Sequence, residues 1–312
     1  MYDFGKVYEA NTVAEAVKLK AEHPEARILA GGSDLLIQMR SGLFAGCDII
    51  SIYLADEMRG VTLEADHTIR IGALTSFSHV TASEVIRKYV PALGEAVDKV
   101  GGPQIRNIGT IGGNVCNAHT GADSGATLFA YDAIAEITGP DGVRTMPIAE
   151  FYRTDGTGVR LERGEILTAL LIPEASYSGY YGSHWKYGLR NAMDVDITGC
   201  STNVKLSDDK KTILDMRMAF AVMGPTPIRA AAAEHAAAGS TVSMDTVKLI
   251  ADKSIEGLSP RTDMRGTKEF RLHTAHVAAR RTFIDAICRA GGDMVSESVP
   301  WEQGPVTSEM GK

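Results

Sequence analysis

Two glycine-rich motifs constrain the possible folds of this 312-residue chain more than any other feature of its sequence. The first, Leu29-Ala30-Gly31-Gly32-Ser33-Asp34, follows a short apolar segment and precedes an apolar helical pattern. The second, Gly109-Thr110-Ile111-Gly112-Gly113-Asn114, lies in a stretch without periodicity. Glycine adopts positive φ readily and lets the backbone approach a ligand closely. Both motifs therefore favour turns in which backbone N–H groups face a bound anion.

Each motif alone also fits an ordinary turn. Ser33 and Asp34 are good helix N-caps, so the first motif could be a capped strand-to-helix turn without a ligand. It is not a Rossmann fingerprint, because the G-x-G-x-x-G spacing is absent. Two separate motifs that each present backbone N–H groups suit a pyrophosphate better than a single phosphate.

Composition argues against several classes of protein. The net charge is -7 and no block of like charges occurs, which argues against nucleic acid as a partner, because phosphate binding requires clustered Lys and Arg. No apolar run approaches the ~20 residues of a membrane span, and residues 1–10 contain no apolar signal segment. The four cysteines are far apart, so we expect free thiols, a cytoplasmic location and no metal site in this chain.

Apolar periodicity and turn residues predict an α+β fold. For a small α/β unit at residues 1–55, we expect helices over 13–22 and from 35, with strands at 27–30 and 48–53. For residues 56–176, we expect strands at 61–64, 68–73, 133–138, from 143 and at 165–172, helices over 77–89 and 91–100, and an irregular stretch at 104–122. For residues 180–290, we expect strands at 183–189, 198–206 and 213–223, then helices over 227–238, 244–256 and 267–290. We expect the polar tail at 291–312 to be disordered.

The chain resembles the FAD-binding subunits of molybdenum hydroxylases of the xanthine dehydrogenase kind. The resemblance covers about residues 1–290, and the two glycine motifs together make it specific. It implies an α+β fold with a two-part N-terminal FAD-binding domain, similar to the PCMH or vanillyl-alcohol-oxidase type, and a C-terminal domain like that of CO dehydrogenase flavoproteins. The segments that carry it are residues 28–34, 71–73, 102–114, 164–167, 186–190, 225–229 and 268–271.

The resemblance implies a role for each matching position. Asp123 would bond the ribityl or ribose hydroxyls, and Ile166 and Leu167 would contact the flavin or adenine face. Trp185 and Lys186 would border the isoalloxazine, although Lys186 alone also fits a surface ammonium. The two glycine motifs and their flanks would wrap the FAD diphosphate with Arg27, Ile28, Leu29, Ala30, Gly31, Gly32, Ser33, Asp34, Gly109, Thr110, Ile111, Gly112, Gly113 and Asn114.

The resemblance further implies an FAD-containing oxidoreductase subunit that transfers electrons and does not bind the organic substrate. A large partner subunit with a molybdenum cofactor would oxidise a purine or similar heterocycle. A small partner subunit with 2Fe–2S clusters would deliver electrons to FAD, and NAD+ or another acceptor would receive them. No side chain is then expected to be a catalytic acid or base, because the cofactor carries the chemistry.

Other functions stay open at this point. The chain could be a free-standing FAD oxidoreductase with its own small substrate, or an assembly module that has lost its flavin. A hydroxylase of the same family that acts on a non-purine heterocycle or an aldehyde is equally compatible with the motifs.

Residues 190–196 follow the strand that carries Lys186 and combine one cation with two carboxylates. The absence of periodicity predicts a mobile loop. The resemblance places this segment beside the flavin ring, where it can limit how NAD+ reaches the cofactor. We hypothesise that Asp194 and Asp196 repel the anionic dinucleotide while Arg190 attracts it. An ordinary surface loop is the alternative.

Overall fold

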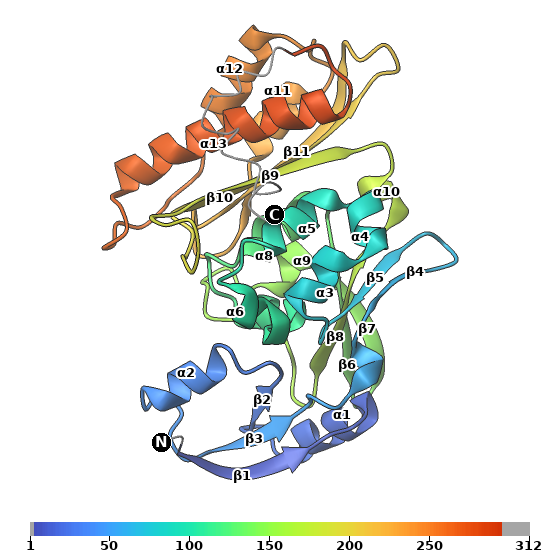
Figure 1. The fold of residues 1–312 in the computed structure, drawn as a ribbon, viewed down its shortest axis with the longest axis vertical. Coiled ribbons are helices and arrows are strands. Elements are labelled where there is room, and N and C mark those ends of the chain that lie inside the picture. The colour runs from blue at the N-terminus through green and yellow to red at the C-terminus, as the bar shows by residue number, and fades with distance from the viewer. Residues whose placement is uncertain (1–2, 295–312) are drawn as a thin grey trace, which may run out of the picture.

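The computed structural model describes residues 3–294 and contains three β-sheets, which follow one another along the long axis of the molecule (Figure 1). The strand orders are β1-β3-β2, β4-β5-β8-β6-β7 and β12-β11-β10-β9. From residue 295 onward, the predicted polar tail lies outside the described residues. Within residues 3–294, no helix combines the length and the apolar character that a membrane span requires.

The first sheet is small and parallel. Helix α1 follows its first strand and is capped by Thr12, whose hydroxyl accepts from the Glu15 N–H at 3.1 Å. The Glu15 carboxylate reaches back to the Asn11 N–H at 2.7 Å, which completes a variant of the capping box. The elements are β1 (Phe4–Glu9), α1 (Val13–Glu22), β2 (Arg27–Leu29), α2 (Leu35–Arg40) and β3 (Cys47–Ser51).

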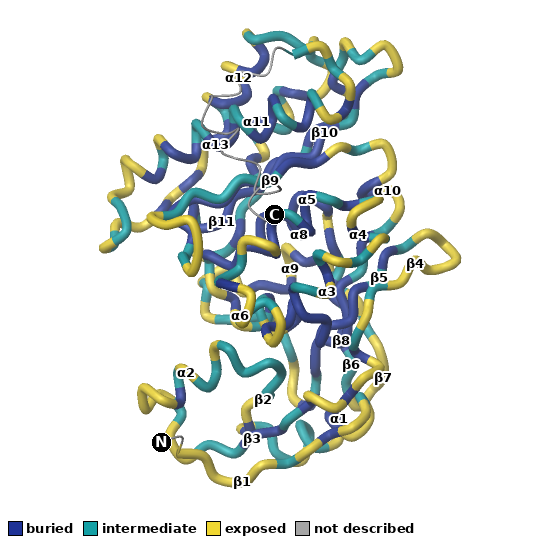
Figure 2. The backbone as a smooth tube through the Cα atoms, viewed as in Figure 1, coloured by how far each residue is buried: buried dark blue, intermediate teal, exposed yellow. Residues whose placement is uncertain are grey.

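The second sheet is antiparallel and lies in the middle of the molecule. Its strand β8 pairs with both β5 and β6, and almost all of its side chains are buried, as the dark-blue trace in Figure 2 shows. Around this sheet lie η1 (Asp56–Met58), α3 (Phe77–Ala82), α4 (Glu84–Tyr89), α5 (Pro91–Val97), α6 (Pro103–Ile108), α7 (Ile111–Cys116), α8 (Asp123–Ala130), α9 (Ile148–Phe151) and α10 (Glu174–Tyr177). The strands are β4 (Val61–Leu63), β5 (Ile69–Gly72), β6 (Ile134–Gly139), β7 (Gly142–Pro147) and β8 (Ile166–Ile172).

The third sheet has a helix layer on one face and α8 on the other. Strand β10 shows the division, because Thr198 bonds to Thr274 of α13 whereas Ser201 bonds to Thr127 of α8. Its side chains therefore alternate between the C-terminal core and the side that faces the second sheet and its helices. The elements are β9 (Tyr181–Tyr187), β10 (Thr198–Leu206), β11 (Ile213–Ala221), β12 (Ile228–Arg229), α11 (Ala231–Ala237), α12 (Met244–Ser254) and α13 (Lys268–Arg289).

Several predicted elements are wrong in detail. The helix expected over 77–89 is broken at Ser83, whose side chain caps α4. The stretch expected to be irregular at 104–122 contains α6 and α7, and the helix expected from 227 begins only at Ala231, after the short strand β12. The strand expected to be buried at 27–30 is an edge strand with Arg27 exposed. Strand β1 and helix α8 were not predicted.

Candidate functional site

The two glycine motifs meet in the structure, although 74 residues of chain lie between them. Gly31 lies directly against the backbone of Ile108, because an added Cβ would overlap the Ile108 carbonyl. A Cβ at Gly109 would lie 3.3 Å from the Ser33 hydroxyl oxygen. The absence of side chains at Gly31 and Gly109 therefore permits the turn after β2 to pack on the α6–α7 junction.

The motifs differ in how their backbone N–H groups are used. In the first motif, the N–H groups of Gly31, Gly32, Ser33 and Asp34 donate to no acceptor within residues 3–294. Gly32 has a φ of 72°, which glycine adopts without strain. Asp34 occupies the N-cap position of α2, but its carboxylate accepts from Gln38 and does not cap the helix.

In the second motif, the protein itself uses these donors. The N–H of Ile111 donates to Thr75 at 3.0 Å and the N–H of Gly112 donates to Ala73 at 2.9 Å. The N–H of Gly113 donates to the Thr110 hydroxyl, which caps α7. The donors available to an anion thus come from the first motif, whereas the second motif forms a wall.

A cavity of about 960 Å³ lies where the two motifs meet. This volume is within the usual range for a cofactor site. Apolar side chains, including Ile52, Leu74 and Phe77, form part of its lining. The predicted cofactor residues that line it are Arg27, Ile28, Ala30, Gly31, Gly32, Ser33, Asp34, Thr110, Gly112, Gly113, Asn114, Ile166 and Leu167.

The cavity lining contains groups of both charges. The cations are Lys20, Arg27 and Arg163, and the Arg27 guanidinium lies 3.9 Å above the Phe44 ring. Lys20 donates to two carbonyl groups, and burial followed by repulsion from Arg27 lowers its pKa. Among the lining carboxylates, Glu165 is neutralised by Arg144, which holds the pKa of Glu165 below its usual range. Arg27 and Arg163 are therefore the cations best able to face an anionic ligand.

Asp123 and Lys186 lie outside the cavity lining, in a buried ion pair between α8 and β9. The Lys186 Nζ atom is 2.6 Å from Asp123 Oδ1 and 3.3 Å from Asp196 Oδ1. It also donates to the carbonyls of Lys99 and Asp194 at 3.0 and 2.9 Å. The ammonium thus has four protein acceptors. The cavity and this ion pair are linked through Asn114, whose side-chain oxygen accepts from the Ser124 hydroxyl at 2.6 Å.

Trp185 points away from this ion pair, because neighbouring residues of a strand face opposite sides of the sheet. It stacks with Tyr187 and lies under the Arg281 guanidinium of α13. Trp185 accordingly packs against the C-terminal core, and it is not part of the cavity lining.

Residues 190–196 are more constrained than the predicted mobile loop. The Met193 N–H donates to Gly101, and the Asp194 carboxylate accepts from the N–H groups of Arg190 and Val195. Asp196 is fully buried. The hypothesis that Asp194 and Asp196 repel an approaching dinucleotide requires both carboxylates to face the solvent, and neither does. The sequence signal that was missed is the position of Asp196 two residues before the buried strand β10.

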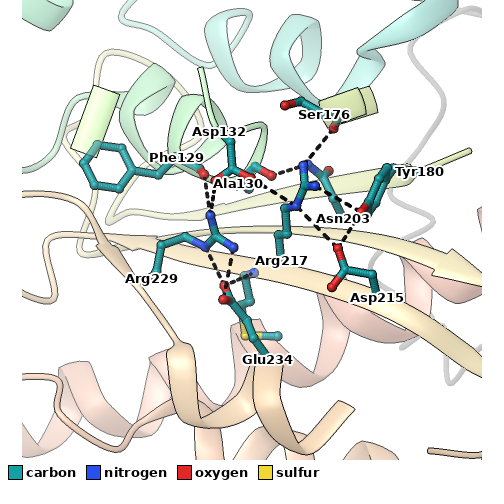
Figure 3. A network of polar contacts seen from close by, with 11 residues as sticks. Phe129, Ala130, Asp132, Ser176, Tyr180, Asn203, Asp215, Arg217, Arg229 and Glu234 are labelled. Carbon is teal, nitrogen blue, oxygen red and sulfur yellow. Dashed lines mark hydrogen bonds and ion pairs between the residues drawn. The ribbon is translucent and has the colours of Figure 1, made fainter. Parts of the chain in front are cut away.

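A second polar cluster joins the other end of α8 to the third sheet (Figure 3). Asp132 forms ion pairs with Arg217 and Arg229, and Arg229 also pairs with Glu234. Arg229 donates to the Phe129 carbonyl at 3.1 Å, so it also satisfies an end of the helix. Within residues 3–294, no group of three or more His, Cys, Asp or Glu side chains is arranged to hold a metal ion.

Comparison with known proteins identifies the family. Residues 2–175 match the FAD binding domain in molybdopterin dehydrogenase, and residues 183–286 match the CO dehydrogenase flavoprotein C-terminal domain. The chain is 38% identical over 294 residues to the xanthine dehydrogenase FAD-binding subunit of Escherichia coli O157:H7, which covers 94% of this chain and 100% of that subunit. It is 30% identical over 282 residues to the carbon monoxide dehydrogenase medium chain of Hydrogenophaga pseudoflava, covering 89% and 95% of the two chains.

Structural comparison agrees with the sequence matches. The carbon monoxide dehydrogenase from Hydrogenophaga pseudoflava that lacks the Mo-pyranopterin moiety superposes with a TM-score of 0.87 at 29% identity, over 93% of this chain and 99% of that chain. The two-domain fold expected from the sequence is thereby confirmed. The chain belongs to the family of FAD-binding medium subunits of molybdenum hydroxylases.

Proposed function

We propose that this chain is the electron-transfer subunit of a heteromeric molybdenum hydroxylase. It would receive electrons from 2Fe–2S clusters on a small partner subunit and pass them to NAD+ or another acceptor. A large partner subunit with the molybdenum cofactor would oxidise the organic substrate, and the complex would be cytoplasmic. The observation that carries this proposal is the cavity at the meeting point of the two glycine motifs, in a chain that matches medium subunits along most of its length.

The residues around the cavity fit FAD. The free N–H groups of the first motif can bind a diphosphate, and the cation of Arg27 lies beside them. Leu74, Phe77 and Leu167 offer an apolar surface to an aromatic ring system. When FAD is bound there, it supplies the redox chemistry, and the chain's own groups bind it, orient it and exclude water.

We assign the diphosphate to residues 27–34 with residues 109–114 as the facing wall, and the apolar ring contact to Ile166 and Leu167. Asp123, Trp185 and Lys186 would reach the cofactor only through a change from the arrangement described above, because they have other partners here. We also propose domain boundaries at 1–176, divided into 1–55 and 56–176, and at 180–290.

Gly113 offers a direct test of the cavity. A Cβ at Gly113 would meet one atom within 4 Å, the Thr110 hydroxyl oxygen at 2.9 Å, so only the Thr110 side chain must shift to admit a methyl group. By contrast, a Cβ at Gly112 would strike the backbone of Ala73. Because Gly113 lies in α7, alanine suits the helix there. We expect Gly113→Ala to weaken FAD binding at least tenfold, which corresponds to about 1.4 kcal/mol.

The measurement is FAD affinity by quenching of flavin fluorescence, with flavin absorption of the purified protein as a second readout. Gly224→Ala is the matched control, because it adds a methyl outside the cavity and should leave affinity unchanged. An unchanged affinity in Gly113→Ala would place the cofactor elsewhere. Co-purification of a large and a small subunit tests the heteromeric assembly separately, and a catalytically active chain that purifies alone would contradict it.

A further inference from the structure

The Lys186 site contains two carboxyl groups and one ammonium group. Asp123 Oδ1 and Asp196 Oδ1 contact the same ammonium nitrogen, at 2.6 and 3.3 Å. Asp196 has no exposed side-chain surface, and Asp123 and Lys186 are 8% and 9% exposed. Two ionised carboxylates and one ammonium would leave a net charge of −1 in this buried space.

Within residues 3–294, no cation other than Lys186 forms an ion pair with Asp123 or Asp196. His184 of β9 lies near Lys186, and its burial lowers the pKa to about 3, so it is neutral. Arg190 pairs with Asp194, and Arg271 of α13 binds the Ile197 carbonyl and Asp263. Lys99, which follows α5, contacts the Lys186 ammonium through its backbone carbonyl.

Hydrogen bonding does not stabilise a second carboxylate either. Within residues 3–294, the Asp196 carboxyl has no hydrogen-bond partner other than the Lys186 ammonium and the Asp123 carboxyl. Asp196 Oδ2 lies against the backbone of Gly199, which offers no side chain as a donor. A second ionised carboxylate that must share one ammonium with Asp123 and has no further donor is strongly disfavoured in a dry site.

We propose that Asp123 and Asp196 share one proton at neutral pH, which makes Asp196 a neutral positioning residue that holds Lys186 against Asp123. Two carboxyl groups that cannot both ionise behave in this way elsewhere in proteins. Burial raises the pKa of both carboxyls, and for Asp196 the neighbouring Asp123 raises it further. Lys186 keeps its proton, because the two carboxyls outweigh the effect of burial and raise its pKa.

Infrared spectroscopy of the full chain tests the proposal directly, because a protonated carboxyl has a carbonyl band distinct from that of a carboxylate. At neutral pH we expect a band equivalent to one carboxylic acid that disappears in Asp196→Asn. It should also disappear in Asp123→Asn, because the remaining carboxyl would then ionise beside Lys186 alone. The second variant keeps the test decisive if Asn at position 196 prevents folding.

Asp194→Asn is the matched control, because Asp194 accepts backbone N–H groups and these help to lower its pKa. It should retain the band. The proposal is overturned if the wild-type chain has no such band at neutral pH, or if the band survives in both the Asp123 and the Asp196 variants.

A second readout concerns the cavity and rests on the proposed function. Ser124, which follows Asp123, bonds to Asn114 in the cavity wall, so the shared proton lies close to the proposed diphosphate site. Loss of the proton would add negative charge there. We expect FAD affinity to fall as pH rises through the pKa of the pair, by at most tenfold per pH unit, and Asp196→Asn to remove this dependence. A band that behaves as expected with no pH dependence of affinity would count against the cofactor site and not against the shared proton.

Discussion

The two ends of α8 have the same excess of acidic groups but different access to water. At the N-terminal end, Asp123 and Asp196 face Lys186, and all three side chains are buried. At the C-terminal end, Asp132, Asp215 and Glu234 face Arg217 and Arg229, and the Asp132 and Asp215 side chains are 47% and 42% exposed. Each cluster therefore has one more carboxyl than cations.

The difference shows how burial changes the consequence of the same charge imbalance. At the exposed end, water solvates the extra carboxylate, so the cluster can stay fully ionised. At the buried end, water cannot do so, and a proton is the simplest remaining source of neutrality. The short helix α8 is thus joined to the third sheet by two polar clusters. We expect the buried cluster to respond to pH and the exposed cluster to respond to salt.

Removing the central cation of each cluster should give the largest contrast. Lys186→Met leaves two carboxyls in a dry site without their cation, and we expect a loss of about 3–5 kcal/mol in the free energy of unfolding at pH 8. Arg217→Met leaves Asp132 and Asp215 partly in water, and we expect a loss of about 1–2 kcal/mol. Chemical denaturation followed by circular dichroism measures both.

The contrast has an internal check. At pH 5, protonation of both carboxyls should reduce the penalty of Lys186→Met, whereas the penalty of Arg217→Met should change little. Equal penalties for the two variants at pH 8 would mean that water reaches the Lys186 site, and the comparison between the two ends of α8 would fail.

Acid should reveal a further difference through His184, which lies at the buried end and contacts the Ser201 hydroxyl at 2.8 Å. Its pKa is about 3 in the folded chain and 6.5 when unperturbed, so the unfolded chain binds one more proton between these values. The contribution of His184 to the free energy of unfolding is therefore complete above pH 6.5. Below pH 6.5 it decreases as the pH falls, by about 1.4 kcal/mol per pH unit. The shared carboxyl proton acts in the opposite direction, because raised carboxyl pKa values stabilise the folded chain as pH falls.

The two contributions can be separated by variants. His184→Gln should reduce the loss of unfolding free energy as the pH falls below 6.5. The change in slope should be largest when both proteins in the comparison carry Asp196→Asn, because the shared carboxyl proton then no longer opposes it. Denaturation midpoints between pH 4 and pH 6.5 give the slopes. An identical slope with histidine or glutamine at this position would show that His184 is protonated in the folded chain.

Local patterns in the sequence were sufficient for elements with strong signals. Apolar periodicity and turn residues predicted the bounds of α1 and β10 correctly. Helix α8 was missed because all eight of its residues are buried, so it lacks the solvent-exposed charged face that marks a surface helix. Helix α7 was missed because Gly112 and Gly113 are poor helix formers, and packing against Ala73 compensates for them.

The candidate site shows the same limit. The resemblance identified both glycine motifs, and the structure brings them together at one cavity. Sequence alone could not show that the N–H groups of the second motif donate to Ala73, Thr75 and Thr110 within the protein. The sequence also predicted that Asp196 lies in a mobile loop. Its contact with Lys186 depends on how two strands and α8 pack, and such long-range contacts leave no local pattern.

The smallest expected effect concerns salt at the exposed end. Asp132→Asn removes the carboxylate between Arg217 and Arg229, yet Arg229 keeps Glu234 and Arg217 keeps Asp215 and the Tyr180 hydroxyl. We expect a loss of about 0.5–1 kcal/mol at low ionic strength, because the pair is half exposed. At 1 M salt the Debye length falls to about 3 Å, so the difference from wild type should nearly vanish. The penalty of Lys186→Met should persist at the same salt concentration, since ions cannot enter a buried site. A salt-independent penalty for Asp132→Asn would instead show that its main role is to fix the Arg229 side chain on the Phe129 carbonyl at the end of α8.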